Sequence, residues 1–65
     1  MVLTPLEEKI VALVTEGLMN HEIGDRLGIS EHVTKNYLKA IFDKVGCSNR
    51  VELALWWMKR REDEK

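Results

Sequence analysis

The stretch of sequence that decides the fold is 17-GLMNHEIGDRLGISEHVTKNYLK-39. Apolar residues recur in it at helical spacing in two short runs, which a Gly-Ile-Ser sequence at 28–30 separates. Gly28 can end the first run in a left-handed conformation, and Ser30 can cap the second. Gly24 has no side chain to obstruct a neighbouring helix. The stretch therefore predicts two short helices joined by a tight turn, which is a helix-turn-helix.

A further helix is expected on the N-terminal side of this stretch. Thr4-Pro5-Leu6-Glu7 predicts its start, because a threonine and a glutamate three residues apart can form a capping box and proline suits the first helical position. Gly17 is placed to end this helix. We expect Asn20 to cap the short helix that follows, and Ile29, in the turn, to enter the core.

The next helix, predicted over about residues 31–45, has one apolar and one polar face. Helical spacing turns Thr34, Leu38, Ile41, Phe42 and Val45 inward, and it turns His32, Lys35, Asn36, Lys39 and Asp43 outward. Gly46 is expected to end this helix.

A fourth helix is predicted over about residues 49–61 with Ser48 as its cap, and the tail at about 62–65 is expected to fray. This helix has two apolar stripes, one of Val51, Leu55 and Met58 and another of Leu53, Ala54 and Trp57. A module of this size cannot bury both stripes. We interpret Lys59-Arg60-Arg61 as favourable charge at a helix C-terminus; contact with a DNA backbone is the alternative.

The composition is typical of a small helical domain. The chain has 65 residues, of which 45% are hydrophobic and 32% charged, and it shows no strand, repeat or linker pattern. We therefore predict a single all-α domain of four helices over residues 1–65. No apolar run approaches the ~20 residues of a membrane-spanning helix, and no signal-peptide pattern opens the chain, so we expect no membrane association and a cytoplasmic location. Cys47 is the only cysteine, which excludes an intrachain disulfide.

The sequence carries none of the residue arrangements that enzymes use. It has no nucleophile and base constellation, its acids Glu7 and Glu8 are adjacent rather than facing, and no glycine-rich phosphate loop follows a strand. His21 and His32 lie on different predicted helices, which is not the spacing of metal ligands. We expect no enzymatic activity, no metal and no cofactor.

Charge is distributed unevenly along the chain. The formal net charge of −1 is unfavourable for DNA binding, because affinity for duplex DNA comes largely from lysine and arginine beside phosphates. However, residues 1–28 carry five acids and two bases (−3), whereas residues 29–65 carry eight bases and six acids (+2). Lys35, Asn36 and Lys39 share the outer face of the third helix, where a helix-turn-helix reads base edges. An ordinary solvated face and a protein-docking surface are the alternatives.

Many residues, in the same order along the chain, agree with the pattern of one known family. They are Leu3-Thr4-Pro5, Glu7, Glu16-Gly17-Leu18, Asn20, Glu22-Ile23, Arg26-Leu27-Gly28-Ile29-Ser30-Glu31, Lys35-Asn36, Leu38-Lys39, Ile41-Phe42, Lys44 and Arg50-Val51-Glu52. The chain thereby resembles, over about residues 3–58, the LuxR-type DNA-binding domain of FixJ/NarL response regulators, quorum-sensing activators and small spore-coat regulators. The resemblance implies a helix-turn-helix of the winged-helix-like superfamily without a wing, and sequence-specific duplex DNA binding in bacterial transcription regulation.

The resemblance also implies a role for individual residues. It places Lys35, Asn36 and Lys39 at base-reading positions and assigns phosphate contacts to Asn20, His21, Ser30, His32, Tyr37 and Lys44. It makes Val51, Leu55 and Met58 the interface of a homodimer. The further partners it suggests are RNA polymerase and a receiver or sensor domain that precedes this module in a longer natural chain.

The chain departs from the family pattern at several positions. His21 stands where the family has lysine, Tyr37 where it has histidine, Leu6 where it often has arginine, and Val33-Thr34 where it has threonine followed by valine. We expect the Thr34 hydroxyl, at a core position, to bond to the carbonyl one turn back. These changes predict weaker and more salt-sensitive DNA binding by the isolated domain than is typical of the family.

Two other functions are compatible with the sequence. Region four of a sigma factor shares the Leu-Thr-Pro opening and the helix-turn-helix, but it contacts RNA polymerase and lacks a dimer interface on the fourth helix. A protein-interaction domain with the same fold and weak or lost DNA binding is the other alternative.

Overall fold

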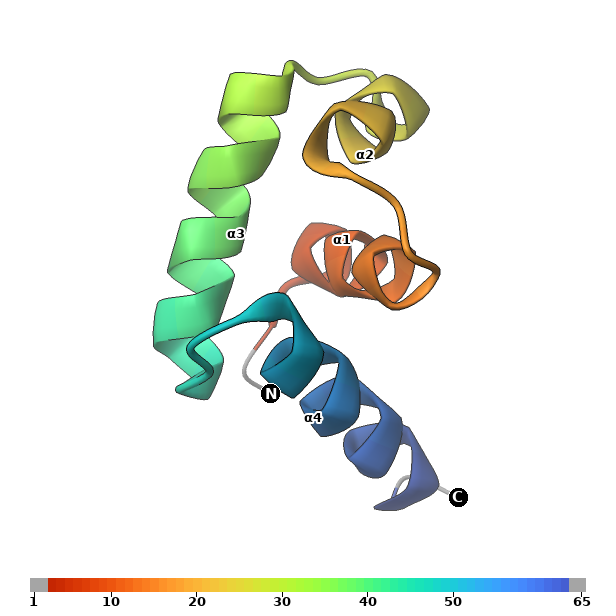
Figure 1. Ribbon diagram of the computed structural model, residues 1–65, viewed down its shortest axis with the longest axis vertical. Helices are drawn as coiled ribbons and strands as arrows, with labels where there is room; N and C mark the ends of the chain where they lie inside the picture. The colour runs from red at the N-terminus through yellow and green to blue at the C-terminus, as the bar shows by residue number, and fades with distance from the viewer. Residues whose placement is uncertain (1–2, 64–65) are drawn as a thin grey trace.

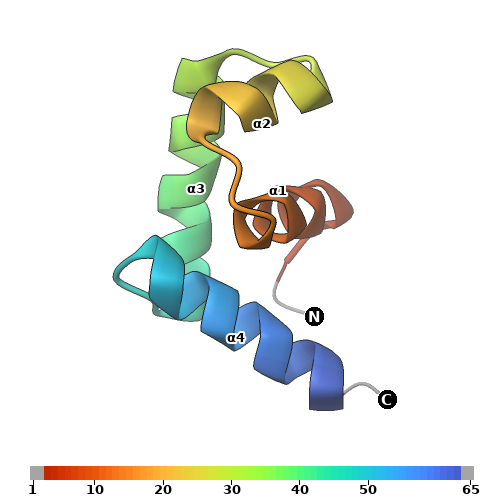
Figure 2. The same ribbon diagram turned by 45° about the vertical axis from the view of Figure 1, so that its right-hand side comes forward.

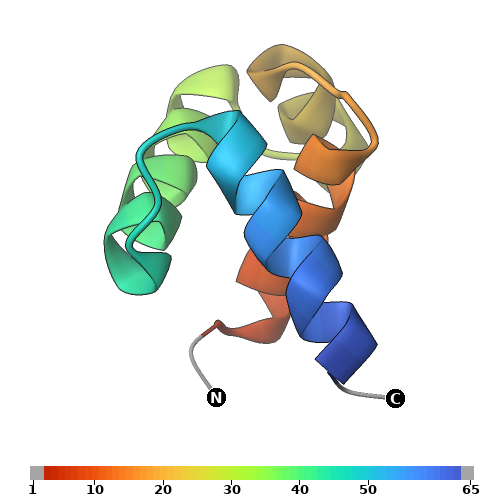
Figure 3. The same ribbon diagram turned by 60° about the horizontal axis from the view of Figure 1, so that its bottom comes forward.

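The computed structural model describes residues 3–63 and has four helices there: α1 (Pro5–Thr15), α2 (Asn20–Leu27), α3 (Glu31–Val45) and α4 (Arg50–Asp63). No strand occurs in these residues, so the predicted all-α fold is confirmed. In Figure 1, α3 runs along one side of the molecule, α2 lies against its first turns, and α1 lies between α2 and α4. Figure 2 shows the same arrangement turned by 45°, and in Figure 3 α4 crosses α1.

The start of α1 is held by the predicted capping box. The Glu7 amide donates to the Thr4 hydroxyl oxygen over 3.2 Å, and the Thr4 amide donates to the Glu7 carboxylate over 2.9 Å. At the other end, Gly17 has a φ of 89°, a conformation that glycine adopts without strain. These two local signals set the ends of α1 as predicted.

The prediction that Asn20 caps α2 is wrong. Asn20 is the first helical residue, and Met19 occupies the cap position. The carboxylate of Glu22 accepts the Met19 amide at 2.7 Å, while the Asn20 side-chain oxygen accepts a hydrogen bond from Arg50 on another helix. Asn20 therefore loses its capping role because a long-range donor uses its oxygen.

The prediction that Ser48 caps α4 is also wrong, by one residue. The Asn49 side-chain oxygen accepts the Glu52 amide at 2.9 Å, and the Glu52 carboxylate in turn accepts the Ser48 amide at 2.6 Å. Asparagine is at least as good a cap as serine. The helix continues to Asp63, so it includes the first part of the tail that we expected to fray, and residues 64–65 lie outside the described part.

The turn between α2 and α3 packs through its backbone. A Cβ atom at Gly24 would lie 2.6 Å from the Ile29 carbonyl oxygen, so the close approach that we predicted at this glycine is present. The Ile29 amide donates to the Gly24 carbonyl at 2.9 Å, and the Ile29 side chain is only half-buried, outside the core cluster. The prediction that Ile29 enters the core is therefore wrong. The main chain of Ile29, rather than its side chain, contacts Gly24.

The start of α3 confirms two predictions. Ser30 caps the helix by accepting the Val33 amide at 3.0 Å, and the fully buried Thr34 hydroxyl donates to the Ser30 carbonyl at 3.0 Å. A polar hydroxyl can thus occupy a core position because it finds an acceptor one turn back.

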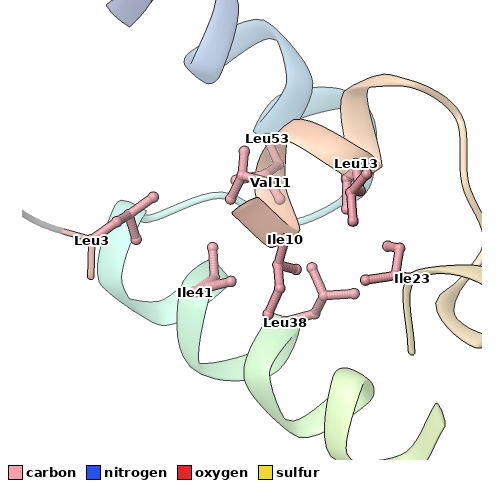
Figure 4. Packing of buried hydrophobic residues seen from close by; sticks show 9 residues of the cluster. Leu3, Ile10, Val11, Leu13, Ile23, Leu38, Ile41 and Leu53 are labelled. Carbon is pink, nitrogen blue, oxygen red and sulfur yellow. The ribbon is translucent and has the colours of Figure 1, made fainter. Parts of the chain in front are cut away.

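All four helices contribute to one core, shown in Figure 4. Its buried side chains are Leu3, Ile10, Val11, Leu13, Val14, Ile23, Leu38, Ile41 and Leu53. Cys47 lies half-buried at its edge, where burial raises the pKa of the thiol. None of the helices described over residues 3–63 is long and apolar enough to span a bilayer. The core holds α3 with its polar face outward.

Candidate nucleic-acid interface

The outer face of α3 carries the three predicted base-reading residues. Lys35, Asn36 and Lys39 are all exposed, whereas Leu38 and Ile41 on the opposite face are buried. The orientation that we predicted from helical spacing is therefore confirmed. Two ammonium groups one turn apart, with an amide beside them, form a row of hydrogen-bond donors on a convex helix.

Three helices surround a groove along one side of this face. Its volume is about 540 Å³, and it is lined by Asn20, His32, Lys35, Asn36, Leu38, Lys39, Phe42 and Arg50. The polar lining side chains are amides, a histidine and cations, with no carboxylate among them. Such a groove favours a ligand that is anionic and rich in hydrogen-bond acceptors.

The other side of the α3 face is mainly apolar. A shallower hollow of about 340 Å³ is lined by Val33, Asn36, Tyr37 and Ala40. Asn36 lines both hollows and so lies between a basic side and an apolar side. The chain thus has an exposed valine where we noted that the family has a threonine.

Arg50, at the start of α4, joins the groove to the rest of the fold. One guanidinium nitrogen donates to the Asn20 side-chain oxygen at 2.7 Å, and the other donates to the Leu18 carbonyl at 2.6 Å. Our sequence reasoning did not select Arg50 as a site residue. A signal was present, because a cation in the first turn of a helix opposes the helix dipole and needs a compensating contact.

The N-terminus of α2 lies next to Arg50. Met19, Asn20, His21, Glu31 and Arg50 line a small hollow of about 180 Å³. His21 is exposed, and the first backbone amides of a helix are unsatisfied donors that favour an anion. Glu31 is the acid at this site, and its charge opposes that preference.

Lys44, a predicted phosphate contact, has a partner inside the protein. Its ammonium donates to both oxygens of Glu7, at 2.8 and 2.9 Å. This hydrogen bond, followed by the one from the Thr4 amide, holds the pKa of Glu7 below its ordinary value. The Lys44 side chain is 41% exposed, so water screens part of the interaction. The structure thus joins the end of α3 to the cap of α1.

The two apolar stripes of α4 lie in different environments. Val51, Leu55 and Met58 are 69%, 62% and 58% exposed, whereas Leu53, on the other stripe, is fully buried. The prediction that one stripe stays exposed is confirmed. Three large apolar side chains on one helix face form a patch of the kind that mediates protein contacts.

In the basic run of α4, Arg60 is half-buried against the fold, whereas Lys59 and Arg61 are exposed. The Arg60 guanidinium lies 3.4 Å from the Glu8 carboxylate and 5.4 Å from the centre of the Trp56 ring, and the Arg61 guanidinium lies 6.0 Å from the centre of the Trp57 ring. Cations over indole rings gain electrostatic attraction. These contacts favour a structural role for the basic run.

We compared the sequence of the chain with those of known proteins. Residues 1–57 match the family described as bacterial regulatory proteins, luxR family. The chain belongs to the luxR family. It is 41% identical over 54 residues to the nitrate/nitrite response regulator protein NarL of Escherichia coli K12. The matched stretch covers 83% of this chain and 25% of NarL.

Two further relatives are similar to the chain over most of its length. The DNA-binding transcriptional activator DevR/DosR of Mycobacterium tuberculosis is 35% identical over 54 residues, which is 83% of this chain and 25% of that protein. An HTH-type transcriptional regulator of Mycobacterium bovis is 41% identical over 51 residues, which is 78% of this chain and 6% of that protein. The chain thus spans only a small part of the relatives that it matches.

The luxR-family module, as far as residues 3–63 describe it, has no group of three His, Cys, Asp or Glu side chains that could hold a metal ion. Its polar groove instead presents donors on three elements. Arrangement and family membership together make the α3 face the candidate binding surface.

Proposed function

We propose that this chain is the DNA-binding domain of a bacterial transcription regulator and that α3 lies in the major groove of duplex DNA. The observation that carries the proposal is the exposed row of Lys35, Asn36 and Lys39 on a helix whose other face is core. Membership of a family of regulatory proteins supports it. So does the relative DevR/DosR, which is named a DNA-binding transcriptional activator.

The chemistry of these side chains suits base edges. Lysine donates to O6 and N7 of guanine, and asparagine pairs with N6 and N7 of adenine, each good contact contributing ~1–3 kcal/mol of discrimination. On this basis Lys35 and Lys39 read guanine, and Asn36, which lies between the basic and the apolar side, reads adenine.

Residues around α3 would place the helix on the DNA backbone. We assign phosphate contacts to Asn20 and His21 at the start of α2, and to His32 and Tyr37 at the flanks of α3, with the Ser30 region at the turn. Lys44 is the exception, because its ammonium binds Glu7. We therefore propose that Lys44 stabilises the fold rather than contacting a phosphate.

We further propose that two copies associate through Val51, Leu55 and Met58 and bind two half-sites. These side chains are exposed apolar residues on one face of α4. Linking two weak sites raises the overall affinity because the second contact forms within the same complex. This dimer interface separates the proposal from a sigma-factor region, which would be monomeric.

We propose that the module belongs to a longer natural protein, and that this protein acts in the cytoplasm. NarL and Rre1 of Synechocystis are named response regulators, and the chain covers 25% and 22% of their lengths. We propose that a receiver or sensor domain precedes this module and that the complete protein acts on transcription by RNA polymerase.

The decisive experiment measures the fluorescence anisotropy of a labelled random-sequence duplex over a salt series. The wild-type chain is compared with Lys39→Ala on the α3 face and with Lys9→Ala on α1, which removes the same charge from an exposed residue. We expect affinity that falls with salt, a marked loss for Lys39→Ala and almost none for Lys9→Ala. Equal effects of the two substitutions would refute α3 as the DNA-facing helix.

The protein-interaction alternative makes the opposite forecast. Under it, the wild-type chain does not bind duplex DNA even at low salt, and Lys35→Ala leaves its folding and its protein partner unaffected. That result would replace DNA binding by protein docking as the function of the domain, with the partner bound elsewhere than at Lys35.

A further inference from the structure

The side chain of Asn20 has only one of its two ends engaged. Its oxygen accepts a hydrogen bond from Arg50 at 2.7 Å, whereas its NH₂ group has no hydrogen-bond partner among residues 3–63. An asparagine amide carries an acceptor at one end and two donors at the other. With its oxygen directed at Arg50, the end of the Asn20 amide that has no partner is the donor end.

Both terminal nitrogens of the Arg50 guanidinium have an acceptor. Its second terminal nitrogen donates to the Leu18 carbonyl at 2.6 Å, so one planar guanidinium connects the start of α4 with both the α1–α2 connection and α2. The two acceptors are 32 and 30 residues away in sequence. A guanidinium held at two points has little freedom to rotate, and it therefore also restricts the amide that it binds.

The hydrogen-bonded pair of Asn20 and Arg50 lies beside the α3 face. Asn20 and Arg50 line the same groove as Lys35 and Lys39. An amide held with its NH₂ end unpartnered favours an acceptor such as a phosphate oxygen, whereas a freely rotating amide would present its oxygen and repel the phosphate in part of its conformations.

We propose that Arg50 is a positioning residue for nucleic-acid binding: it fixes the Asn20 amide so that the NH₂ group donates to a DNA backbone phosphate beside the α3 face. This inference rests on the proposed function, which supplies the duplex. It adds a residue of α4 to the determinants of DNA affinity and gives Asn20 a defined orientation.

The test uses Arg50→Lys, which keeps the charge but cannot engage both acceptors with one planar group. We expect duplex affinity to fall about five- to tenfold at every salt concentration. The slope of log affinity against log salt should stay unchanged, because the lost contact comes from the neutral amide of Asn20. Arg26→Lys, at an exposed residue of α2, is the matched control and should bind like the wild type.

A double-mutant cycle separates positioning from general stability. Asn20→Ala should weaken binding as much as Arg50→Lys does, and the double variant should bind no more weakly than either, because both remove one contact. Additive losses would overturn the proposal, as would an Arg50→Lys variant with wild-type affinity.

Asn20→Asp keeps the test informative if Arg50→Lys fails to fold. It retains an oxygen for Arg50, so thermal stability should be preserved, but it puts a negative charge where the NH₂ donor stood. We expect duplex affinity to fall further than in Asn20→Ala; equal or better binding would overturn the proposal. If the wild-type chain binds no duplex, the proposed function and this inference fail together, whereas wild-type binding that ignores Asn20 overturns this inference alone.

Discussion

Replacing Glu7 by Gln is expected to lower the free energy of unfolding by about 1–2 kcal/mol at neutral pH. Glu7 is 5% exposed, and its carboxylate accepts the Lys44 ammonium at 2.8 and 2.9 Å and the Thr4 amide at 2.9 Å. Glutamine keeps the volume and an acceptor for Thr4 but loses the charge. A hydrogen bond between charged groups contributes ~1.5–3 kcal/mol, and the 41% exposure of Lys44 reduces this through screening.

The effect should depend on pH in a defined direction. The Lys44 hydrogen bond, then the Thr4 amide, depresses the pKa of Glu7 below its ordinary value of 4.5. Between the depressed pKa and the ordinary one, the unfolded chain binds more protons. The stabilisation is therefore fully present above pH 4.5 and is lost as the pH falls through the depressed value.

Urea unfolding followed by tryptophan fluorescence, at neutral pH and in acid, measures this difference between wild type and Glu7→Gln. Lys44→Met and the double variant complete a cycle that isolates the ion pair. The reasoning is refuted if Glu7→Gln matches the wild type at neutral pH, or if the difference between them persists undiminished in acid. A Lys44→Met variant that lost DNA affinity without losing stability would return Lys44 to the DNA backbone.

Three more predictions follow from packing and exposure. Gly24→Ala should cost ~1–3 kcal/mol in chemical denaturation despite the better helix propensity of alanine, because the new Cβ meets backbone; a stabilised variant would show that the turn can move. Leu55→Glu, at a side chain that is 62% exposed, should preserve the helical content measured by circular dichroism and convert the proposed dimer to a monomer in sedimentation equilibrium, and an intact dimer would exclude this face. Exchanging Val33 and Thr34 for Thr and Val should change stability by less than ~1 kcal/mol, since the Thr34 hydroxyl bond is modest, and should raise duplex affinity; unchanged affinity would mean that residue 33 does not face a phosphate.

Local chemistry explains what could be predicted of the fold. The Thr4 capping box, the glycines at helix ends and the Ser30 cap all operate within four residues, so their signals are contained in the sequence. The two wrong caps show where such local signals compete. In both cases capping groups stood close together in the sequence. At α2 a long-range contact decided between them, because Arg50 binds the Asn20 oxygen; at α4 the choice is local, between the adjacent Ser48 and Asn49.

Periodicity predicted the candidate site only as a helix face. It placed Lys35 and Lys39 outward correctly, because a buried stripe on one side of a helix fixes the opposite side. It could not find the contacts between distant segments, such as Lys44 with Glu7, which are 37 residues apart. Those contacts depend on how helices are docked, and helix docking is not a property of any one segment.

These long-range contacts also bear on the affinity of a single copy for DNA. Residues 29–65 contain eight bases, but Lys44 binds Glu7 and Arg60 lies against Glu8, both within the fold. Arg50 is held by two acceptors. Lys35 and Lys39, with the fixed Arg50 beside them, are then the main cations of this groove, and few cations release few counterions. We expect weak binding per copy from this distribution of charge, and in the proposed dimer a second copy, held through the exposed apolar stripe of α4, would add further cations to the same DNA.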